Sequence, residues 1–419
     1  MVRFRDVLKE RNFRCLWLGQ IVSNFGDRLN QMALIGFVSQ KAPHSTYELA
    51  KLMLFIVVPV FVIGPVAGAY VDRWNRRHIM IIADVARGLL VLLIPYCILN
   101  FESSIPVYLI VFLIFSLTRF FLPSKMAIIP TIVSKEKLLV ANSLSDTTYM
   151  IATVLSIGVA GLLIKFAGVL GGFFINSGSF FFSAALISLI RPKEHSGERG
   201  YREDLKLVGA AVESVLRKSI WKQVIEGIQF IVSYPKARFV MNTLFLLMAG
   251  AGAIFCVIIV FIQEKFGTLT SDLGLLGMFL GIGLLFGALL YGRLGQHFNK
   301  QKVILSSFIL GGLGIASFAF IIPRFPTYMV AGFLSIFIGV VLSPVIISIN
   351  TLIHETIPDK MRGRIFSSQE IVIHLAFLLF MFITAILAEY IDRMWILVGC
   401  GAIFALIGTL RLGLLSLKD

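Results

Sequence analysis

The chain has 419 residues, of which 58% are apolar and only 15% are charged, and its formal net charge is +15. Soluble domains average about 45–50% apolar and about 25% charged residues, so a soluble fold of this length has too small an interior for so many apolar side chains. The same composition excludes a disordered chain, a collagen and a coiled coil. The sequence therefore predicts an integral membrane protein.

Apolar runs long enough to cross a bilayer follow one another along the whole chain. A transmembrane helix needs about 20 predominantly apolar residues to span roughly 30 Å of hydrocarbon. Twelve runs meet this requirement: 15–40, 48–71, 78–99, 105–132, 144–166, 169–190, 238–263, 272–292, 302–322, 327–350, 369–388 and 394–413. The predicted fold is all-α, an integral membrane protein with twelve transmembrane helices.

The longest polar segment, 191–222, separates the sixth run from the seventh. A basic loop follows the second run of each half, at Gly68–Arg77 and at Gly287–Arg293, and another basic loop follows each fourth run. Parallel similarity between halves of six spans is typical of a transporter built from two bundles. We therefore expect an N-terminal six-helix bundle (1–190), a central cytoplasmic loop (191–222) and a C-terminal six-helix bundle (223–419).

The basic residues are distributed unevenly among the predicted loops. With the N-terminus inside, the cytoplasmic segments hold 29 of the 38 Lys and Arg residues, and Lys125 is counted there, in segment 122–138. The outer loops hold six, and Arg28, Arg87 and Arg119 lie within spans. Because cytoplasmic loops of membrane proteins are enriched in Lys and Arg, both termini are predicted to be cytoplasmic. The positive charge is thus an orientation signal, and no nucleic-acid partner is needed to explain it.

Motifs for catalysis and cofactors are absent from the sequence. The four cysteines, Cys15, Cys97, Cys256 and Cys400, are far apart and have no metal-binding or disulfide spacing. The chain has no P-loop, no Gly-x-Ser-x-Gly, no HExxH and no paired CxxC motif. We therefore expect neither cofactor nor metal. A membrane enzyme would need His, Asp or Glu clustered at one membrane face, and the sequence shows no such cluster.

Ionisable residues inside the spans are the candidates for function. Inserting an Asp or Arg near the centre of a membrane helix costs about 2.5–3.5 kcal/mol of free energy, so such a residue usually has a structural or functional role. Asn24, Asp27 and Gln31 have i, i+3, i+7 spacing and share one helix face. Arg28 follows Asp27, and Arg119 lies in the fourth span. Either arginine is a candidate ion partner for Asp27.

Other polar residues in spans have simpler explanations. Asp84 and Arg87 are three residues apart, which favours an intrahelical ion pair, and His374 is expected to be a packed side chain. Two interpretations of Asp27 remain open. It carries a coupling proton, which requires that its pKa differ between two states, or it forms a permanent ion pair between the first and fourth spans.

The loop after the second span resembles the signature loop of the major facilitator superfamily. The matching residues are Gly68, Asp72, Arg73, Arg76 and Arg77, and Arg293 belongs to a degenerate second copy. The chain also resembles the bacterial branch that contains macrolide-efflux proteins, the enterobactin exporter and the lysophospholipid transporter. The segments that carry this second resemblance are 64–80 with Asp84, 292–295 and 362–367, and Phe25-Gly26-Asp27 resembles the lysophospholipid transporters in particular.

The resemblance implies a secondary active transporter that works by alternating access. It implies that the signature loop latches the two bundles together, and that Asp27, Arg28 and Arg119 lie along the central cavity. We expect a monomer in the bacterial cytoplasmic (inner) membrane, surrounded by lipid. Its expected function is efflux by proton antiport of an amphipathic small molecule such as a drug, as in multidrug exporters, or a siderophore. The alternatives are a lysophospholipid transporter without an obligatory proton and, third, nutrient uptake.

Overall fold

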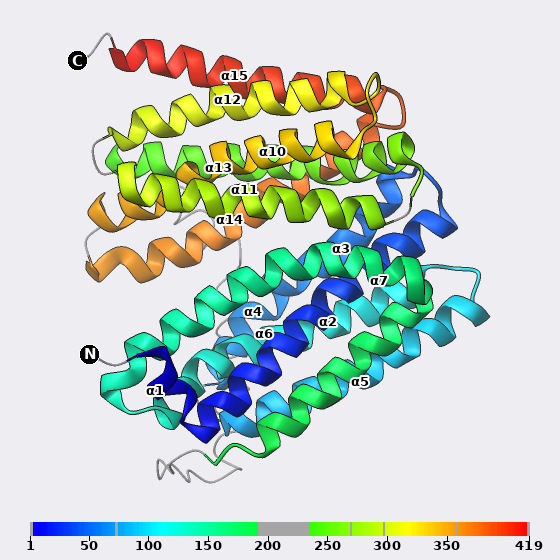
Figure 1. Cartoon of the computed structure of the whole chain (residues 1–419), viewed down its shortest axis with the longest axis vertical. Helices are drawn as coiled ribbons and strands as arrows, with labels where there is room; N and C mark the ends of the chain where they lie inside the picture. Colours follow the sequence, from blue (N-terminus) through cyan, green and yellow to red (C-terminus); the bar gives the residue numbers. More distant parts are fainter. Residues whose placement is uncertain are drawn as a thin grey trace. The chain divides into compact units, whose positions relative to one another are not determined.

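The computed structural model describes residues 3–71, 74–191, 235–268, 270–295, 298–356 and 359–416. All regular structure in these ranges is helical, which confirms the predicted all-α class. The elements, labelled as in Figure 1, are α1 (Phe4–Leu8), α2 (Arg11–Lys41), α3 (Thr46–Val62), α4 (Gly64–Val71), α5 (Arg76–Asn100), α6 (Ile105–Ile132), the 3₁₀ turn η1 (Lys135–Lys137), α7 (Leu138–Ser188), α10 (Pro235–Phe266), α11 (Ser271–Leu294), α12 (Lys300–Ile321), α13 (Tyr328–Thr356), α14 (Asp359–Leu387) and α15 (Arg393–Ser416).

Eight helices in the described part of the chain are long and apolar enough to cross a membrane. They are α5, α6, the stretch Lys135–Ser188, α10, α11, α12, α13 and α15. Val372–Leu387, within α14, is a shorter apolar helix. All twelve predicted runs overlap helical segments, but twelve membrane crossings remain a prediction.

The first two predicted spans differ from the others for reasons visible in their sequences. The helix α2 contains many polar side chains, which lower its mean hydropathy and form the candidate site described below. The run 48–71 is divided at Ile63 into α3 and α4. Pro65, the second residue of α4, has no backbone N–H with which to continue the hydrogen bonding of α3.

A single glycine separates the fifth and sixth predicted spans. These spans, 144–166 and 169–190, both belong to α7, whose regular geometry is interrupted only at Gly168. Its backbone angles, φ of 72° and ψ of 172°, lie in a region that residues with a Cβ essentially never adopt. The chain therefore passes from one predicted span to the next through one residue that must be glycine.

The chain divides into two compact units. The first comprises Met1–Phe37 and Leu52–Ser219, and the second comprises Val38–Lys51 and Ile220–Asp419. Within the first unit, α5 packs against α6 and α7, and α4 packs against α6. Within the second unit, α11 packs against α13, α12 against α15, and α10 against α14. The predicted domain boundaries remain a prediction, because most of the central loop 191–222 lies outside the described residues.

Polar contacts hold the short segment Val38–Lys51 against the rest of the second unit. Gln263 donates to the Ser39 hydroxyl at 2.8 Å. Arg393, the first residue of α15, donates to Thr46 Oγ1 at 3.2 Å, to the His44 carbonyl, and to Glu264 at 2.8 Å. One guanidinium therefore joins this segment to both α10 and α15.

Candidate functional site

A row of polar side chains runs along α2. Asn24, Asp27 and Gln31 share one face and are half-buried, as their spacing predicts. The Arg28 guanidinium donates to Gln31 Oε1 at 3.1 Å, and it lies 3.5 Å from the hydroxyl of Tyr149 on α7. Arg28 thus contacts Gln31, one of the polar residues expected to act with it on this helix, and Tyr149 on another helix.

Two glycines bring α2 close to a polar stretch of α7. A Cβ on Gly26 would lie 2.5 Å from Asn176 Oδ1 and 2.8 Å from Ser179 Cβ, so these side chains would have to move to make room for it. A Cβ on Gly19 would lie 3.3 Å from Ser183 Oγ. Small residues on α2 therefore permit a close helix contact directly beside Asp27.

A buried ion pair lies on α5. Asp84 and Arg87 are both buried, and their side chains form the salt bridge that the i, i+3 spacing predicts, which confirms the intrahelical pair. The guanidinium carbon of Arg87 lies 4.6 Å from the ring centre of Phe121 and 4.3 Å from that of Phe180. The Arg87 guanidinium also donates to Thr118 Oγ1 at 3.4 Å. Partners on α5, α6 and α7 thus hold this cation.

The charges that act on Asp27 differ from those expected. Among the described residues, the cations that interact with the Asp27 carboxylate are Arg87, Arg28 and Lys125. The carboxylate of Asp84 also interacts with Asp27. Arg87 therefore lies within the electrostatic reach of two carboxylates. Arg119 is half-buried on α6. Of the two partners predicted from the sequence, the structure places Arg28 in this group.

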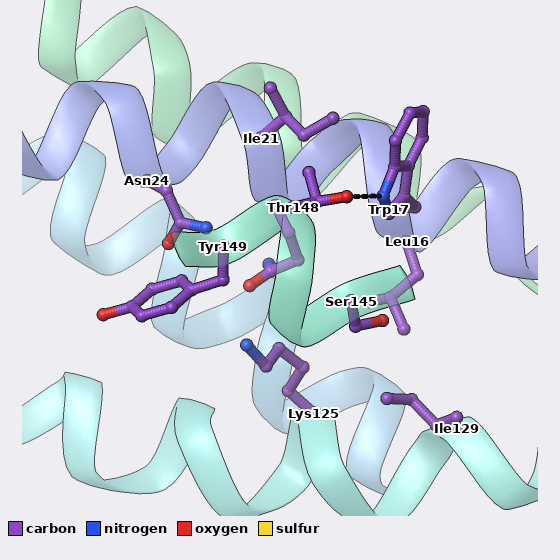
Figure 2. Close-up of a pocket in the computed structure, with 10 residues that line it drawn as sticks. Leu16, Trp17, Ile21, Asn24, Lys125, Ile129, Ser145, Thr148 and Tyr149 are labelled. Atoms are coloured by element: carbon purple, nitrogen blue, oxygen red, sulfur yellow. Dashed lines mark hydrogen bonds between the residues drawn. The ribbon is translucent and has the colours of Figure 1, made fainter. Parts of the chain in front are cut away.

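A pocket lies in the first unit, between α2, α6 and α7 (Figure 2). Most of its wall is neutral, either apolar or hydrogen-bonding. Its lining residues are Leu16, Trp17, Gln20, Ile21, Asn24, Lys125, Ile129, Ser145, Thr148 and Tyr149. The indole of Trp17 donates to Thr148 Oγ1 at 3.0 Å, which fixes one side of the wall. The polar face of α2 therefore borders a pocket with both apolar and polar walls.

Lys125 is a site residue that the sequence interpretation missed. The charge pattern predicts a loop position for Lys125, and this is wrong, because the residue lies within α6 and lines the pocket. Its ammonium lies 5.7 Å from the ring centre of Tyr149, toward which it points in Figure 2. One signal was available: Lys125 falls inside the apolar run 105–132, where a charge requires a reason.

The signature-loop residues make contacts inside the first unit where they are described. Arg76 donates to the Ala127 carbonyl of α6 at 2.9 Å. Arg77 donates to the carbonyls of Ile187, at 3.3 Å, and Ser188, at the carboxyl end of α7. Both carbonyls belong to the last turn of α7, where the negative end of the helix dipole favours a cation, so Arg77 stabilises that end.

The other signature residues are not brought together by the described contacts. Gly68 lies in α4, and Arg293 is an exposed residue of the last turn of α11. Asp72 and Arg73 lie outside the described residues. The latch function of this loop therefore remains a prediction.

Long apolar helices together with a partly polar pocket are typical of a membrane transporter. The chain belongs to the Major Facilitator Superfamily, whose model matches residues 16–367 and 240–418. This confirms the resemblance stated from the signature loop. The family and its relatives are transporters, which indicates that this chain is not an enzyme.

The similar proteins include named exporters. The multidrug efflux pump Tap of Mycolicibacterium fortuitum is 26% identical over 74% of this chain and 72% of the relative. Macrolide efflux protein A of Streptococcus pyogenes is 25% identical over 95% of this chain and 93% of the relative. The inward-facing crystal structure of a bacterial homologue of the iron transporter ferroportin has a TM-score of 0.69 at 14% identity, covering 95% of this chain and 98% of that one. That likeness shows the fold alone.

Proposed function

We propose that this protein is a secondary active exporter of the bacterial cytoplasmic membrane that works by alternating access between its two halves. The efflux proteins among its relatives match most of its length, which supports export of an amphipathic small molecule such as a drug or a siderophore. The sequence has no P-loop, so the energy would come from an ion gradient and not from ATP. The proposed coupling ion is the proton.

The position of Asp27 among several charges is the observation on which proton coupling rests. Asp27 interacts with Lys125, which lines the pocket, with Arg28, which contacts the pocket residue Tyr149, and with Arg87, which is already paired with Asp84. A rearrangement that changes the separation of Asp27 from these cations changes its affinity for a proton. Since Lys125 lines the pocket, the same rearrangement would accompany substrate binding or release.

The test is transport by the purified full-length protein in proteoliposomes with an imposed pH gradient. Asp27→Asn is expected to abolish gradient-driven transport of an exported substrate, with erythromycin and a siderophore as the first compounds. Exchange of substrate across the membrane without a gradient should continue, because the variant retains the side-chain shape and the pocket. Glu102→Gln, a change at an exposed loop acid, is the control and should transport normally.

The competing interpretation predicts a different result for the same variant. If Asp27 forms only a permanent ion pair, Asp27→Asn leaves a buried cation uncompensated and destabilises the fold by several kcal/mol. A lower melting temperature together with lost exchange would support that interpretation. Wild-type stability with wild-type gradient-driven export would contradict both interpretations.

A lysophospholipid transporter without an obligatory proton is the second candidate. The observation that favours it is the segment Phe25-Gly26-Asp27, whose glycine lies against Asn176 and Ser179 of α7. This candidate predicts that lysophospholipid crosses the membrane at the same rate with and without a pH gradient. It also predicts that lysophospholipid, and neither macrolides nor siderophores, raises the melting temperature. Nutrient uptake would require net inward movement of substrate.

A further inference from the structure

We propose that the pocket between α2, α6 and α7 binds the anionic group of an amphipathic ligand through Lys125. The shared chemistry is a phosphate or carboxylate attached to an apolar body. This inference rests on the proposed transport function and specifies its substrate class.

The charge of the pocket wall supports an anion. Lys125 is the only charged side chain among the ten that line the pocket. Within the described ranges, its ammonium makes no hydrogen bond and has no carboxylate within 4 Å; its nearest assigned contact is the Tyr149 ring. Asp27 and Asp146 interact with Lys125, but neither lines the pocket. A half-buried ammonium without an acceptor gains a strong, charge-assisted hydrogen bond when a ligand supplies an anionic oxygen.

A second donor on the wall also lacks a protein acceptor. Gln20 lines the same pocket, and its buried Nε2 has no hydrogen-bond partner among the described residues. Amide N–H groups and an ammonium donate to the same kind of ligand atom, an oxygen that carries negative charge. Gln20 and Lys125 therefore each present a hydrogen-bond donor to the pocket that no described protein acceptor uses.

The remaining wall fits the apolar part of an amphipathic molecule. Leu16, Ile21 and Ile129 contribute aliphatic side chains. In Figure 2, Asn24 and Tyr149 lie toward the left, Lys125 lies near the middle, and Leu16 and Ile129 lie toward the right. A ligand with a charged head and an apolar body would thus contact both kinds of surface at once.

The experiment measures binding by the purified full-length protein in nanodiscs of neutral lipid. The probes share one aromatic body: 1-naphthyl phosphate, 1-naphthylacetate, neutral 1-naphthylmethanol and cationic 1-naphthylmethylammonium. Fluorescence titration is expected to show that the two anions bind at least about tenfold more tightly than the neutral and cationic probes, as expected for a hydrogen bond between charged groups.

Variants of Lys125 test the assigned group. Lys125→Met and Lys125→Gln remove the charge and should abolish the preference for anions, whereas Lys125→Arg should retain it. Lys165→Met, an exposed position of α7 outside the pocket, is the matched control and should behave as wild type. An anion preference that persists in both neutral variants, or equal binding of the cationic probe to the wild type, would overturn the inference.

Competition then distinguishes two sources of the anion. Displacement of naphthyl phosphate by lysophosphatidylglycerol indicates a lipid headgroup, and displacement by water-soluble amphipathic acids alone indicates a free solute; either result supports the site. The binding assay requires no transport. Lys125-dependent binding with no gradient-driven movement of any substrate would refute the export proposal and leave this one standing. Gradient-driven export of a cationic drug without any anion preference would refute only this one.

Discussion

Arg87 is a fully buried cation whose partners come from three helices of the first unit. Its charge is balanced by Asp84 on the same helix, and its flat guanidinium lies between the rings of Phe121 and Phe180. Cation–π contacts in a desolvated position are worth about 2 kcal/mol, so the rings contribute to holding the ion pair in the interior. The group is also one of the charges that act on Asp27. A change at Arg87 should therefore affect both stability and coupling.

Arg87→Met is expected to lower the melting temperature of the purified protein markedly. The substitution preserves an apolar stem but leaves the Asp84 carboxylate buried without its cation, which typically costs about 3–5 kcal/mol. The double variant Asp84→Asn/Arg87→Met removes both charges and should be more stable than Arg87→Met alone. Thermal unfolding measures both, with the exposed Lys165→Met as control. A double variant less stable than the single one would contradict the role of charge compensation.

Spacing within one helix predicts the Asp84–Arg87 pair, because residues three apart on a helix face each other. Contacts between helices are not encoded in such spacing. The sequence therefore predicted Arg28 as a partner of Asp27, but neither the contribution of Arg87 nor the position of Lys125 in the pocket wall. A position in the fourth span makes Arg119 a candidate partner of Asp27, yet the direction of its side chain depends on how α6 packs.

At the scale of the helices, apolar length predicts where the elements lie. Every predicted run overlaps a helix, since about 20 apolar residues in lipid have no other way to satisfy their backbone groups. The breaks are harder to predict. The division between α3 and α4 and the continuation of α7 through Gly168 depend on local backbone geometry, and hydropathy does not report it.

Gly168→Ala should destabilise the protein by about 1–3 kcal/mol, because the alanine would have to adopt backbone angles that essentially only glycine tolerates. A Cβ there would meet no other atom, so the effect would come from the backbone alone. Gly178→Ala is the matched control on the same helix, where the added methyl also meets open space and no positive φ is required. It should be neutral or stabilising by ~0.5–1 kcal/mol. Equal melting temperatures for the two variants would contradict the interpretation of Gly168 as an obligatory turn.

The contact between α12 and α15 gives a second prediction for the helices. A Cβ on Gly401 would collide with the Gly312 carbonyl and lie 3.1 Å from the Ala316 Cβ, whereas one on Gly399 would meet nothing. Gly401→Ala should therefore force these helices apart and cost about 1–3 kcal/mol, as overpacking usually does. Gly399→Ala, two residues away on α15, should leave thermal unfolding unchanged or raise its midpoint. The reverse order of stabilities would show that this close approach does not hold the second unit together.

At the scale of the whole molecule, the signature loop is expected to control the equilibrium between transport states. Arg76 and Arg77 bind carbonyls of α6 and α7, so they hold the start of α5 within the first unit. Asp72 is the only acidic residue of the loop, and the superfamily resemblance assigns it the latch. Asp72 lies outside the described residues, so its latch function rests on the sequence.

Asp72→Asn should leave insertion and melting temperature unchanged, since it keeps the size of the side chain. It should abolish most transport and increase the inward-open population, because the anion that holds the outward-open state is gone. Distances between spin labels on the exposed residues Leu139, in the first unit, and Phe298, in the second, would report the populations. Glu136→Gln, at an exposed acid of η1, is the control. Unchanged distance distributions together with intact transport would refute the latch.

The orientation of the whole chain is predicted by its charge. With Lys125 placed in α6, 28 of the 38 Lys and Arg residues still fall in the segments predicted to be cytoplasmic, against six in the outer loops. Moving one lysine does not alter the asymmetry on which orientation depends. Both termini, the signature loop and the segment 191–222 should therefore face the cytoplasm.

Labelling of single introduced cysteines tests this topology in a protein whose four native cysteines are replaced by alanine. Three of these, Cys15, Cys97 and Cys256, are buried, so a small apolar residue suits their surroundings. In intact cells an impermeant maleimide should label Ser104→Cys, in the predicted outer loop between α5 and α6. It should label Ser196→Cys only after the membrane is permeabilised. Labelling of Ser196→Cys from outside intact cells would overturn the orientation, and with it the assignment of the signature loop to the cytoplasmic side.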